Sequence, residues 1–434
     1  MAQTNLKNAR ALAADLLQKV IDAKQFSNIV LDKALEVCEL SDLDKRLVSA
    51  LFYGVIERKL TLDYRISQLS NRPLEQIDNH TLCALRLGLY QLIYMDKIPV
   101  HAAINETVSL CPRRTSGFVN GILRAHTRAP QIEFPSKDED AAKYLSIKYS
   151  VSYEICKRFS SVFGTEKAEK LLASFGAEKG TAIRTNTLKI TRDNLLSKID
   201  GATAESLSPH AIRVSGAVRD IYGFEDGLFF VQDCASQICV ETLDAKEGEL
   251  VMDICACPGS KSFGAAINMK NSGSVLSFDL HQKKLSLITS GAKRLGIDII
   301  EVKEQDGRVP LENLFGKADK VLCDVPCSGF GVLGKKPELR YKDPKESEAL
   351  PDIQLAILEN ACNYLKAGGT LIYSTCTLLP EENEGNVMRF LSSHPDFSLV
   401  PFSVGDISAP LGYLTLTPDV HQTDGFFIAK LTRS

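Results

Sequence analysis

The stretch Met252-Asp-Ile-Cys-Ala-Cys-Pro-Gly-Ser-Lys-Ser262 decides the fold of this chain. Residues 249–254 are apolar enough for a buried strand, Pro258 and Gly259 force a turn, and residues 262–268 have helical composition. A strand, a tight turn and a helix open a doubly wound α/β sheet, in which ligands bind beyond the carboxyl ends of the strands. The sequence therefore predicts a small-molecule site at this turn.

The turn lacks the patterns that hold a pyrophosphate. Neither G-x-G-x-x-G nor G-x-x-x-x-G-K-[ST] follows this strand. The next apolar run, residues 274–278, is followed by Asp279, which is placed to hold the two hydroxyls of a ribose. A nucleoside without a pyrophosphate fits best, and S-adenosylmethionine is the commonest such cofactor. The alternative is an ordinary strand that ends in a solvated Asp.

Further strands are expected along the chain, each with polar residues at its end. Apolar runs at 298–302, 320–323 and 370–374 precede Asp306, Asp324 and Cys376, with helices expected at 282–295 and 351–365. The pair Gly368-Gly369 is expected to form the turn into the strand at 370–374, and residues 412–416 and 425–431 predict an antiparallel pair at the sheet edge. Because the carboxyl ends of parallel strands share one edge, the polar ends are expected to face one crevice.

Two of these strand ends carry a cysteine, Cys327 in one and Cys376 in the other. A thiolate at a strand-to-helix turn is stabilised by backbone N–H groups and can attack as a nucleophile. Two thiols beside a methyl-donor site favour an unreactive acceptor such as cytosine C5, which becomes nucleophilic only after a thiolate adds at C6. Asp324 is suited to hold N3 and N4 of that ring. The alternative is two structural thiols at strand ends.

Composition limits the class of protein and its surroundings. A chain of 434 residues predicts two or three domains, and a net charge of -3 means that any RNA surface is a local patch. The N-terminus has no apolar signal core and no run of 18 apolar residues exists, so we expect a cytoplasmic protein without a membrane segment. A monomer is expected because the sequence carries no oligomerisation signal. The twelve cysteines are expected to be reduced thiols without a metal, because Cys255 and Cys257 have no second pair at ligand spacing.

The N-terminal part of the sequence predicts helices to about residue 128, followed by a linker at 129–140 and helix at 144–175. Strands at 181–186, 211–214 and 228–231 with a helix at 193–199 predict a small α+β module. A basic run closes the first helical region, and it is either a solvated helix face or a phosphate-binding patch. Its five basic-type side chains are Arg113, Arg114, Arg124, His126 and Arg128.

Several motifs carry a resemblance to known families. Ile98-Pro-Val-His-Ala-Ala-Ile-Asn-Glu106 and Gly117-Phe-Val-Asn-Gly-Ile-Leu-Arg124 resemble the NusB-like RNA-binding domain. The segments from Asp253 to Lys261, from Asp324 to Gly331 and from Tyr373 to Asn383 resemble, as an ordered set, the three signature motifs of RNA cytosine-C5 methyltransferases. Together they resemble the RsmB subfamily, also called Sun or Fmu, which methylates 16S small-subunit ribosomal RNA. Asp424-Gly-Phe-Phe-Ile-Ala-Lys430 matches its C-terminal strand.

The resemblance implies a fold and a division of the chain. It implies a Rossmann-like S-adenosylmethionine-dependent methyltransferase domain at 236–434, an all-α NusB-like domain at 1–130, and linker helices with the α+β module at 131–235. The implied RNA-binding residues are Arg113, Arg114, Arg124 and Arg128.

The resemblance also implies site residues. Cys376 is the attacking thiol, Cys327 assists product release, and Asp324 holds the base. DNA cytosine methyltransferases use the Pro-Cys thiol instead, so the exchanged assignment of the two cysteines stays open. The implied cofactor-binding residues are Cys255, Ala256, Cys257, Pro258, Gly259, Ser260, Lys261, Asp279, Asp306 and Asp324.

Two departures from the family pattern lie in the cofactor loop. Cys257 stands where Ala is usual, and Ser260 stands where Gly is usual, so Ser260 is expected to need a conformation that Gly finds easier. Two other functions remain open: a methyltransferase of transfer RNA or another RNA, and an RNA-binding assembly factor without turnover.

Overall fold

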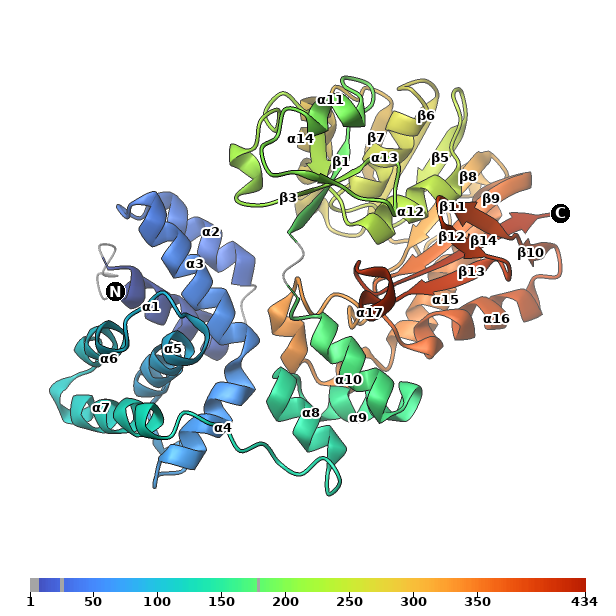
Figure 1. Cartoon of the computed structure of the whole chain (residues 1–434). Coiled ribbons are helices and arrows are strands. Elements are labelled where there is room, and N and C mark those ends of the chain that lie inside the picture. The colour runs from blue at the N-terminus through green and yellow to red at the C-terminus, as the bar shows by residue number, and fades with distance from the viewer. Residues whose placement is uncertain (1–7, 24–26, 178–179) are drawn as a thin grey trace. The chain divides into compact units, whose positions relative to one another are not determined.

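The computed structural model describes residues 8–23, 27–177 and 180–434 of the chain. It divides into two compact units (Figure 1). One contains the residues up to Ala173 together with Lys335–Asp343, and the other contains Ser174–Gly334 and Pro344–Ser434. None of the helices in these described ranges is both long and apolar enough to span a bilayer.

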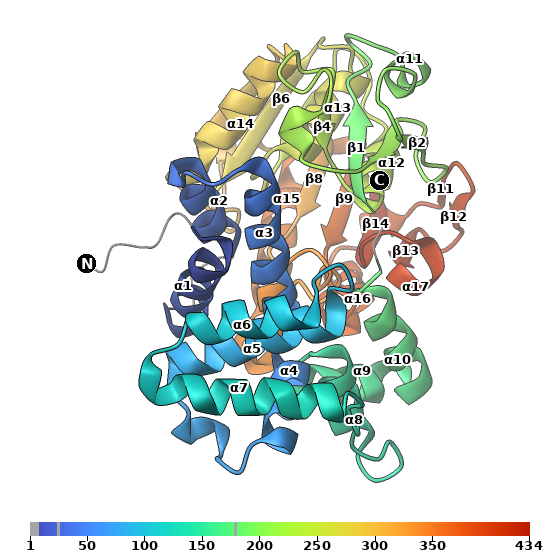
Figure 2. The ribbon, with the colours of Figure 1, turned by 60° about the vertical axis from the view of Figure 1, so that its left-hand side comes forward.

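The first unit is helical, as the sequence predicts. Ser41 caps α3 by accepting a hydrogen bond from the Asp44 N–H, and Asp78 caps α5 in the same way through Thr81. Helix α5 is buried along most of its length because α1, α3, α4, α6 and α7 all pack on it, and α6 and α7 lie beside it in Figure 2. The helices are α1 (Ala9–Ala23), α2 (Ser27–Val37), α3 (Asp42–Glu57), α4 (Lys59–Leu69), α5 (Asn79–Tyr94), α6 (Val100–Ser109), α7 (Arg113–Arg128), α8 (Ala141–Tyr149), α9 (Tyr153–Phe163) and α10 (Thr165–Ser174).

A segment from the distant half of the chain completes this unit. Lys335–Asp343, which contains the 3-10 turn η4 (Pro337–Tyr341), packs against α3. Arg340 Nη1 donates to the Tyr149 carbonyl oxygen at 3.0 Å, and the Tyr341 hydroxyl contacts the Ile56 carbonyl oxygen. No motif or periodicity in the sequence predicts this insertion.

The second unit begins with a small antiparallel sheet in the order β2-β3-β1-β4. Its strands are β1 (Thr181–Thr185), β2 (Thr203–Ala204), β3 (Ala211–Val214) and β4 (Phe229–Val231), with α11 (Arg192–Leu196) between β1 and β2. The side chain of Asn186 donates to the carbonyl oxygens of Gly227 and Leu295, and the buried Arg184 pairs with Glu241 at 2.6 Å. These polar groups therefore tie the small sheet to the larger α/β layer structure that follows.

The larger sheet has the order β10-β14-β9-β8-β5-β6-β7, and β13 pairs with β14. Five neighbouring strands of this sheet are parallel: β7, β6, β5, β8 and β9. β14 pairs antiparallel with β9, and β10 and β13 pair antiparallel with β14. From β5 the chain builds the sheet outward through β6 to β7, and it then returns to the other side of β5 to form β8 and β9. At such a switch in strand order, the carboxyl ends of the strands leave a crevice beside β5. The strands are β5 (Leu250–Asp253), β6 (Ser274–Asp279), β7 (Ile300–Glu304), β8 (Ala318–Asp324), β9 (Leu365–Thr375), β10 (Phe397–Leu399), β13 (Tyr413–Leu416) and β14 (Phe426–Arg433).

Helices cover both faces of this sheet (Figure 1). Val251 belongs to the core cluster with α12 (Cys234–Leu243), α13 (Ser260–Asn268) and α14 (Gln282–Leu295). Its neighbour Met252 belongs to the opposite cluster with α15 (Leu350–Ala361) and α16 (Glu384–Ser393). The alternation follows from the two-residue period of a strand, so the doubly wound fold is confirmed.

Some predicted boundaries were wrong. β7 begins at Ile300 rather than 298, and β9 begins at Leu365, so Gly368 and Gly369 lie within the strand rather than before it. The register with β8 shifts between Ala318 and Lys320, and Gly368 takes a φ of 75°, so these glycines form an irregular bulge. The short hairpin β11 (Phe402–Val404) and β12 (Ile407–Ala409), and α17 (Pro418–His421), were not predicted.

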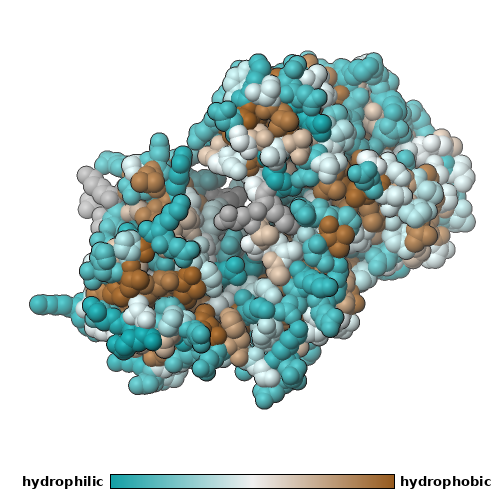
Figure 3. Space-filling model, viewed as in Figure 1, coloured by the Kyte–Doolittle hydropathy of each residue, from teal (hydrophilic) through white to brown (hydrophobic). Residues whose placement is uncertain are grey.

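The face shown in Figure 3 is mostly hydrophilic, and its hydrophobic residues form separate patches. Large hydrophobic side chains that are exposed come from different elements, such as Leu43 of α3, Leu287 of α14 and Leu411 before β13. Many of the buried hydrophobic side chains of the described ranges form three large core clusters.

Candidate active site

The loop after β5 is fixed by hydrogen bonds to the neighbouring strand. Ala256 N–H donates to the Phe278 carbonyl oxygen at 2.7 Å, and Cys257 N–H donates to Asp279 Oδ2 at 3.1 Å. Gly259 takes a φ of 106°, where an added Cβ would crowd the Phe263 ring. Ser260 is already the first residue of α13. The expectation that Ser260 needs a glycine-like conformation is therefore wrong, because Gly259 makes the turn.

An ion pair between the buried Lys261 and the partly exposed Asp324 lies at the carboxyl ends of β5 and β8. Lys261 Nζ is 2.6 Å from Asp324 Oδ2, and the Ser374 hydroxyl donates to Asp324 Oδ1 at 2.9 Å. Burial by itself lowers the pKa of Lys261, but the Asp324 carboxylate outweighs this effect and the pKa is raised. Lys261 therefore stays a cation, and Asp324 is held from two sides.

Asp253 lies close enough to interact electrostatically with both members of this pair. Burial raises the pKa of Asp253 to about 7, and the Ser262 hydroxyl donates to its Oδ2 at 2.6 Å. Its Oδ1 has no hydrogen-bond partner within residues 8–23, 27–177 and 180–434. A buried carboxyl with one oxygen unused is a polar group that a bound ligand can still engage.

The two cysteines of the predicted rim face each other. Cys327 Sγ and Cys376 Sγ are 3.0 Å apart, and the Cys376 N–H donates to Cys327 Sγ at 3.2 Å. The hydrogen bond to Cys376 and burial raise the pKa of Cys327 well above its usual value. The Cys376 backbone N–H lowers the pKa of Cys327, as expected for a thiolate at a strand end, but the thiol contact and burial outweigh it, so Cys327 is a thiol at rest.

The remaining acidic residues of the rim gather around Cys255. Burial raises the pKa of Cys255 well above its usual value, and four carboxylates raise it further. These carboxylates belong to Asp253, Asp324, Asp279 and Asp306. Asp306 itself pairs with Arg308 at 2.7 Å. The structure therefore brings the predicted strand ends to one edge of the sheet.

A small cavity of about 20 Å³ opens at this edge. Gly259, Asp279 and Asp306 were expected at the cofactor site but do not line this cavity. Ser374 and Glu382 were not assigned a role, although both lie in the quoted motif 373–383, because their partners are distant in sequence. The cavity is lined by Asp253, Cys255, Ala256, Cys257, Pro258, Ser260, Lys261 and Asp324.

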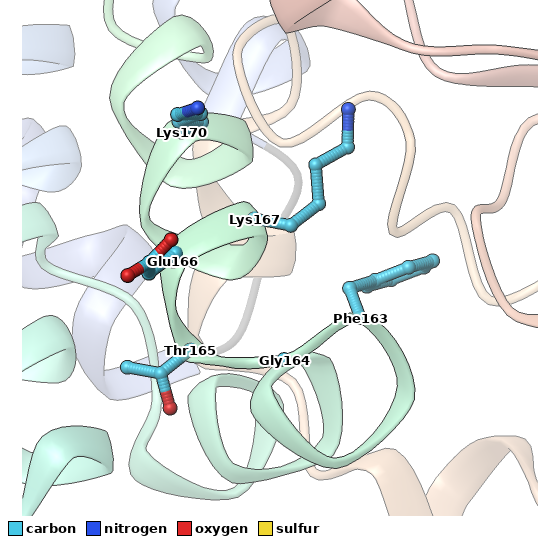
Figure 4. A pocket seen from close by; sticks show the side chains of 6 residues that line it. All are labelled: Phe163, Gly164, Thr165, Glu166, Lys167 and Lys170. Atoms are coloured by element: carbon cyan, nitrogen blue, oxygen red, sulfur yellow. The ribbon is translucent and has the colours of Figure 1, made fainter.

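A larger hollow of about 370 Å³ lies in the helical unit, at the junction of α9 and α10 (Figure 4). Phe163 and Lys167 project to one side of the ribbon, whereas Thr165 and Glu166 project to the other (Figure 4). These side chains do not converge on one point, so the size of the hollow does not make it a site.

Four of the five basic-type side chains of α7 are exposed, and we call them the arginine face: Arg113, Arg114, Arg124 and Arg128. His126 is not part of this surface, because it is buried and its Nδ1 accepts a hydrogen bond from Arg65 Nε at 3.1 Å. Burial and the nearby Arg65 lower the pKa of His126 to about 4. Including His126 in a cationic patch was therefore wrong.

No group of three or more His, Cys, Asp or Glu side chains in the described ranges is arranged to hold a metal ion. What the crevice offers instead is a turn suited to a nucleoside, an ion pair and two facing thiols. On a parallel sheet with an antiparallel β14, these features define a class: a Rossmann-like methyltransferase domain that follows a helical unit.

Comparisons with known proteins specify the family. A model described as 16S rRNA methyltransferase RsmB/F matches residues 240–432, and the NusB family model matches residues 7–128. The probable ribosomal RNA small subunit methyltransferase B of Bacillus subtilis is 35% identical, covering 98% of this chain and 99% of its own. The ribosomal RNA small subunit methyltransferase B of Klebsiella pneumoniae is 32% identical and covers 98% of both chains.

Solved structures of related proteins have the same fold. The crystal structure of PH0851 has a TM-score of 0.78 at 26% identity, with 98% of each chain covered. A methyltransferase homolog protein from Pyrococcus horikoshii has a TM-score of 0.59 at 28% identity, covering 68% of this chain and 99% of its own. The chain belongs to the ribosomal RNA small subunit methyltransferase B family, and the resemblance seen in its motifs is confirmed.

Proposed function

We propose that this chain transfers a methyl group from S-adenosylmethionine to C5 of a cytosine in small-subunit (16S) ribosomal RNA. The observation that carries the proposal is the 3.0 Å separation of Cys327 Sγ and Cys376 Sγ beside the Lys261–Asp324 pair. Full-length relatives named for methylation of this RNA support the choice of substrate over transfer RNA. The intact thiol pair favours an enzyme over an assembly factor without turnover.

The residues at the crevice fit S-adenosylmethionine. Asp279 is partly exposed and suited to the ribose hydroxyls, and the exposed Leu280 beside it offers an apolar surface to the adenine. The Cys257 N–H of the loop donates to Asp279, and the same loop lines the small cavity together with Asp253, whose Oδ1 has no partner in the described ranges. When bound, the cofactor supplies an electrophilic methyl group.

The protein's own groups prepare the base. We assign Cys376 as the nucleophile: its thiol loses its proton to solvent, and the thiolate forms a bond to C6 of the cytosine as the C5–C6 π bond breaks and its electron pair shifts toward C5 and N3. Asp324 holds N3 and N4 and favours the adduct. After methylation the C5 proton passes to Cys327 as its thiolate, the C5–C6 double bond forms again, and the Cys376 Sγ–C6 electron pair returns to sulfur. In the adduct Cys376 is a thioether, so its hydrogen bond no longer raises the pKa of Cys327, which then ionises more easily.

The test compares wild type with Cys376→Ala and Cys327→Ala, using radiolabelled S-adenosylmethionine and deproteinised small-subunit RNA from cells that lack the enzyme. We expect methylated cytosine from wild type, none from Cys376→Ala, and a trapped covalent protein–RNA species from Cys327→Ala. Cys111→Ala, a thiol in the helical unit, is the matched control. Methylation by Cys376→Ala would mean that Cys327 is the nucleophile and Cys376 assists product release. Absence of methylation by wild type would refute the proposed reaction.

RNA binding by the arginine face is part of the same proposal. At 3.6 residues per turn the four arginines fall within an arc of about 100° on α7. Gly117 and Gly121 lie on this arc, and a Cβ at either would meet nothing within 4 Å. Arginines around an open stretch of backbone suit a phosphodiester chain that approaches the helix closely.

The division of labour along the chain is also proposed. Residues 1–130 and 131–235 would grip the RNA and residues 236–434 would carry out the chemistry, with the target base flipped out of its stack. The hydrophobic cluster between Ala9 and Leu123 supports the first of these boundaries. We further propose that the enzyme acts as a monomer in the cytoplasm, where the family's substrate is made.

A further inference from the structure

A buried carboxylate lies near the two cysteines and accepts a hydrogen bond from the residue that follows Cys327. Glu382, at the end of the 3-10 turn η7 (Pro380–Glu382), is only 1% exposed. Its Oε2 accepts the Ser328 N–H at 2.9 Å and the Gln354 Nε2–H at 2.8 Å. Its backbone carbonyl oxygen accepts the Tyr373 hydroxyl at 2.6 Å. Glu382 thus joins the Cys327 loop, α15 and β9.

A carboxylate in this position is costly for the fold. Burial of a charge is unfavourable unless cations or several hydrogen bonds compensate it. Glu382 pairs with no cation in the described ranges, and its Oε1 has no hydrogen-bond partner there. A residue needed only for packing would be apolar, so the carboxylate indicates a role in the site.

The geometry directs that role to Cys327. The Ser328 N–H that Glu382 holds belongs to the residue directly after Cys327, and the Ser328 hydroxyl lies 2.7 Å from the hydroxyl of Thr377, directly after Cys376. The two cysteine loops are therefore joined side by side, and Glu382 anchors the Cys327 loop from behind.

We propose that Glu382 is a positioning residue for product release: it holds the Cys327 loop so that Cys327 Sγ reaches the C5 proton of the methylated adduct. The inference rests on the proposed function, since it needs the adduct at Cys376. Without the anchor the Cys327 loop shifts, whereas Cys376, directly after β9, stays in place because Ser374 and Thr375 pair with β8 and β14. Release is therefore slowed more than adduct formation.

The variants Glu382→Gln and Glu382→Ala separate this role from folding. Glutamine keeps the shape of the side chain and one oxygen to accept the Ser328 N–H, whereas alanine removes the anchor. A displacement of this kind near a reacting atom costs up to about 100-fold in rate. We expect alanine to slow release by up to that factor and glutamine to recover much of it, with KM for RNA unchanged. Glu384→Gln, the same substitution two residues on, is the matched control.

The readout is the fraction of enzyme covalently bound to RNA during turnover, measured on denaturing gels beside wild type and Cys327→Ala. Accumulated adduct in the alanine variant, less in the glutamine variant and a wild-type level in Glu384→Gln support the inference. A wild-type adduct fraction and turnover in Glu382→Gln and Glu382→Ala overturn it, as does loss of adduct formation in a folded Glu382→Ala protein. If the alanine variant does not fold, Glu382→Gln decides: a raised adduct fraction supports the inference and a wild-type fraction overturns it. Failure of wild type to methylate would instead refute the proposed function.

Discussion

Asp253 makes the stability of the α/β unit depend on pH, and this can be tested by Asp253→Asn. Burial raises the pKa of this carboxyl from 3.8 to about 7, so the folded protein binds a proton that the unfolded chain releases. The stability due to this proton is complete below pH 3.8 and is lost as the pH rises to about 7. The amide side chain of the variant cannot ionise, so its unfolding free energy does not fall with pH through this group.

The size of the effect follows from the shift. One pKa unit corresponds to about 1.4 kcal/mol, and the folded carboxyl is half ionised at about pH 7, so a rise from about pH 5 to about pH 7 removes roughly 2 kcal/mol of unfolding free energy from wild type. Further rise to about pH 8 adds little, since the folded carboxyl is then ionised. The difference in unfolding free energy between wild type and Asp253→Asn is expected to change by this amount.

The measurement is urea denaturation at a series of pH values, followed by far-ultraviolet circular dichroism because the chain contains no Trp. Asp319→Asn, on β8 of the same sheet, is the control. Burial raises the pKa of Asp319, but hydrogen bonds from the Leu250 N–H and Lys366 outweigh it, and the pKa is lowered below 3.8. The contribution of Asp319 to folding stability is therefore lost only in acid. A difference between wild type and Asp253→Asn that stays constant from about pH 5 to about pH 8 would refute the reasoning.

Two further changes test the packing of the site and the RNA surface. In Gly331→Ala the added Cβ would overlap the Gly425 carbonyl oxygen, so thermal unfolding should show a loss of about 1–3 kcal/mol. Gly117→Ala, in open space on α7, should instead gain up to about 1 kcal/mol, and equal effects at both glycines would contradict the packing argument. Replacing the four residues of the arginine face by Gln should reduce the slope of log K for RNA against log salt by about 0.7–0.9 per lost phosphate contact. Lys246→Gln is the control for this four-residue variant. An unchanged slope would mean that the four arginines only face solvent and do not contact the RNA.

Local patterns were sufficient for the elements that carry the chemistry. The strand, turn and helix around Met252, and the helix at 282–295, follow from apolar periodicity and from Pro and Gly at the turn. The strand ends met at one edge because parallel topology requires it. Boundaries failed at Gly368, where a bulge keeps two glycines within a strand, and no periodicity reports a bulge.

Long-range contacts lay beyond the sequence analysis. Nothing in the composition of 335–343 shows that Tyr341 contacts Ile56, since the two are separated by 285 positions. His126 looked like part of a cationic patch, and only the packing of α4 against α7 buries it beside Arg65. Glu382 stands in a recognisable motif, but its partners Ser328 and Gln354 come from other elements.

The amino-acid sequence by itself determined the class of fold, the order of the motifs and the residue types at the strand ends, because these depend on local periodicity and turn chemistry. The tertiary structure alone decided which side chains meet and in what protonation state. The thiol separation of 3.0 Å, the ion pair of Lys261 and the raised pKa of Asp253 all arise from burial and from neighbours on other strands. Such electrostatic effects depend on distance and desolvation, which no single stretch of sequence contains.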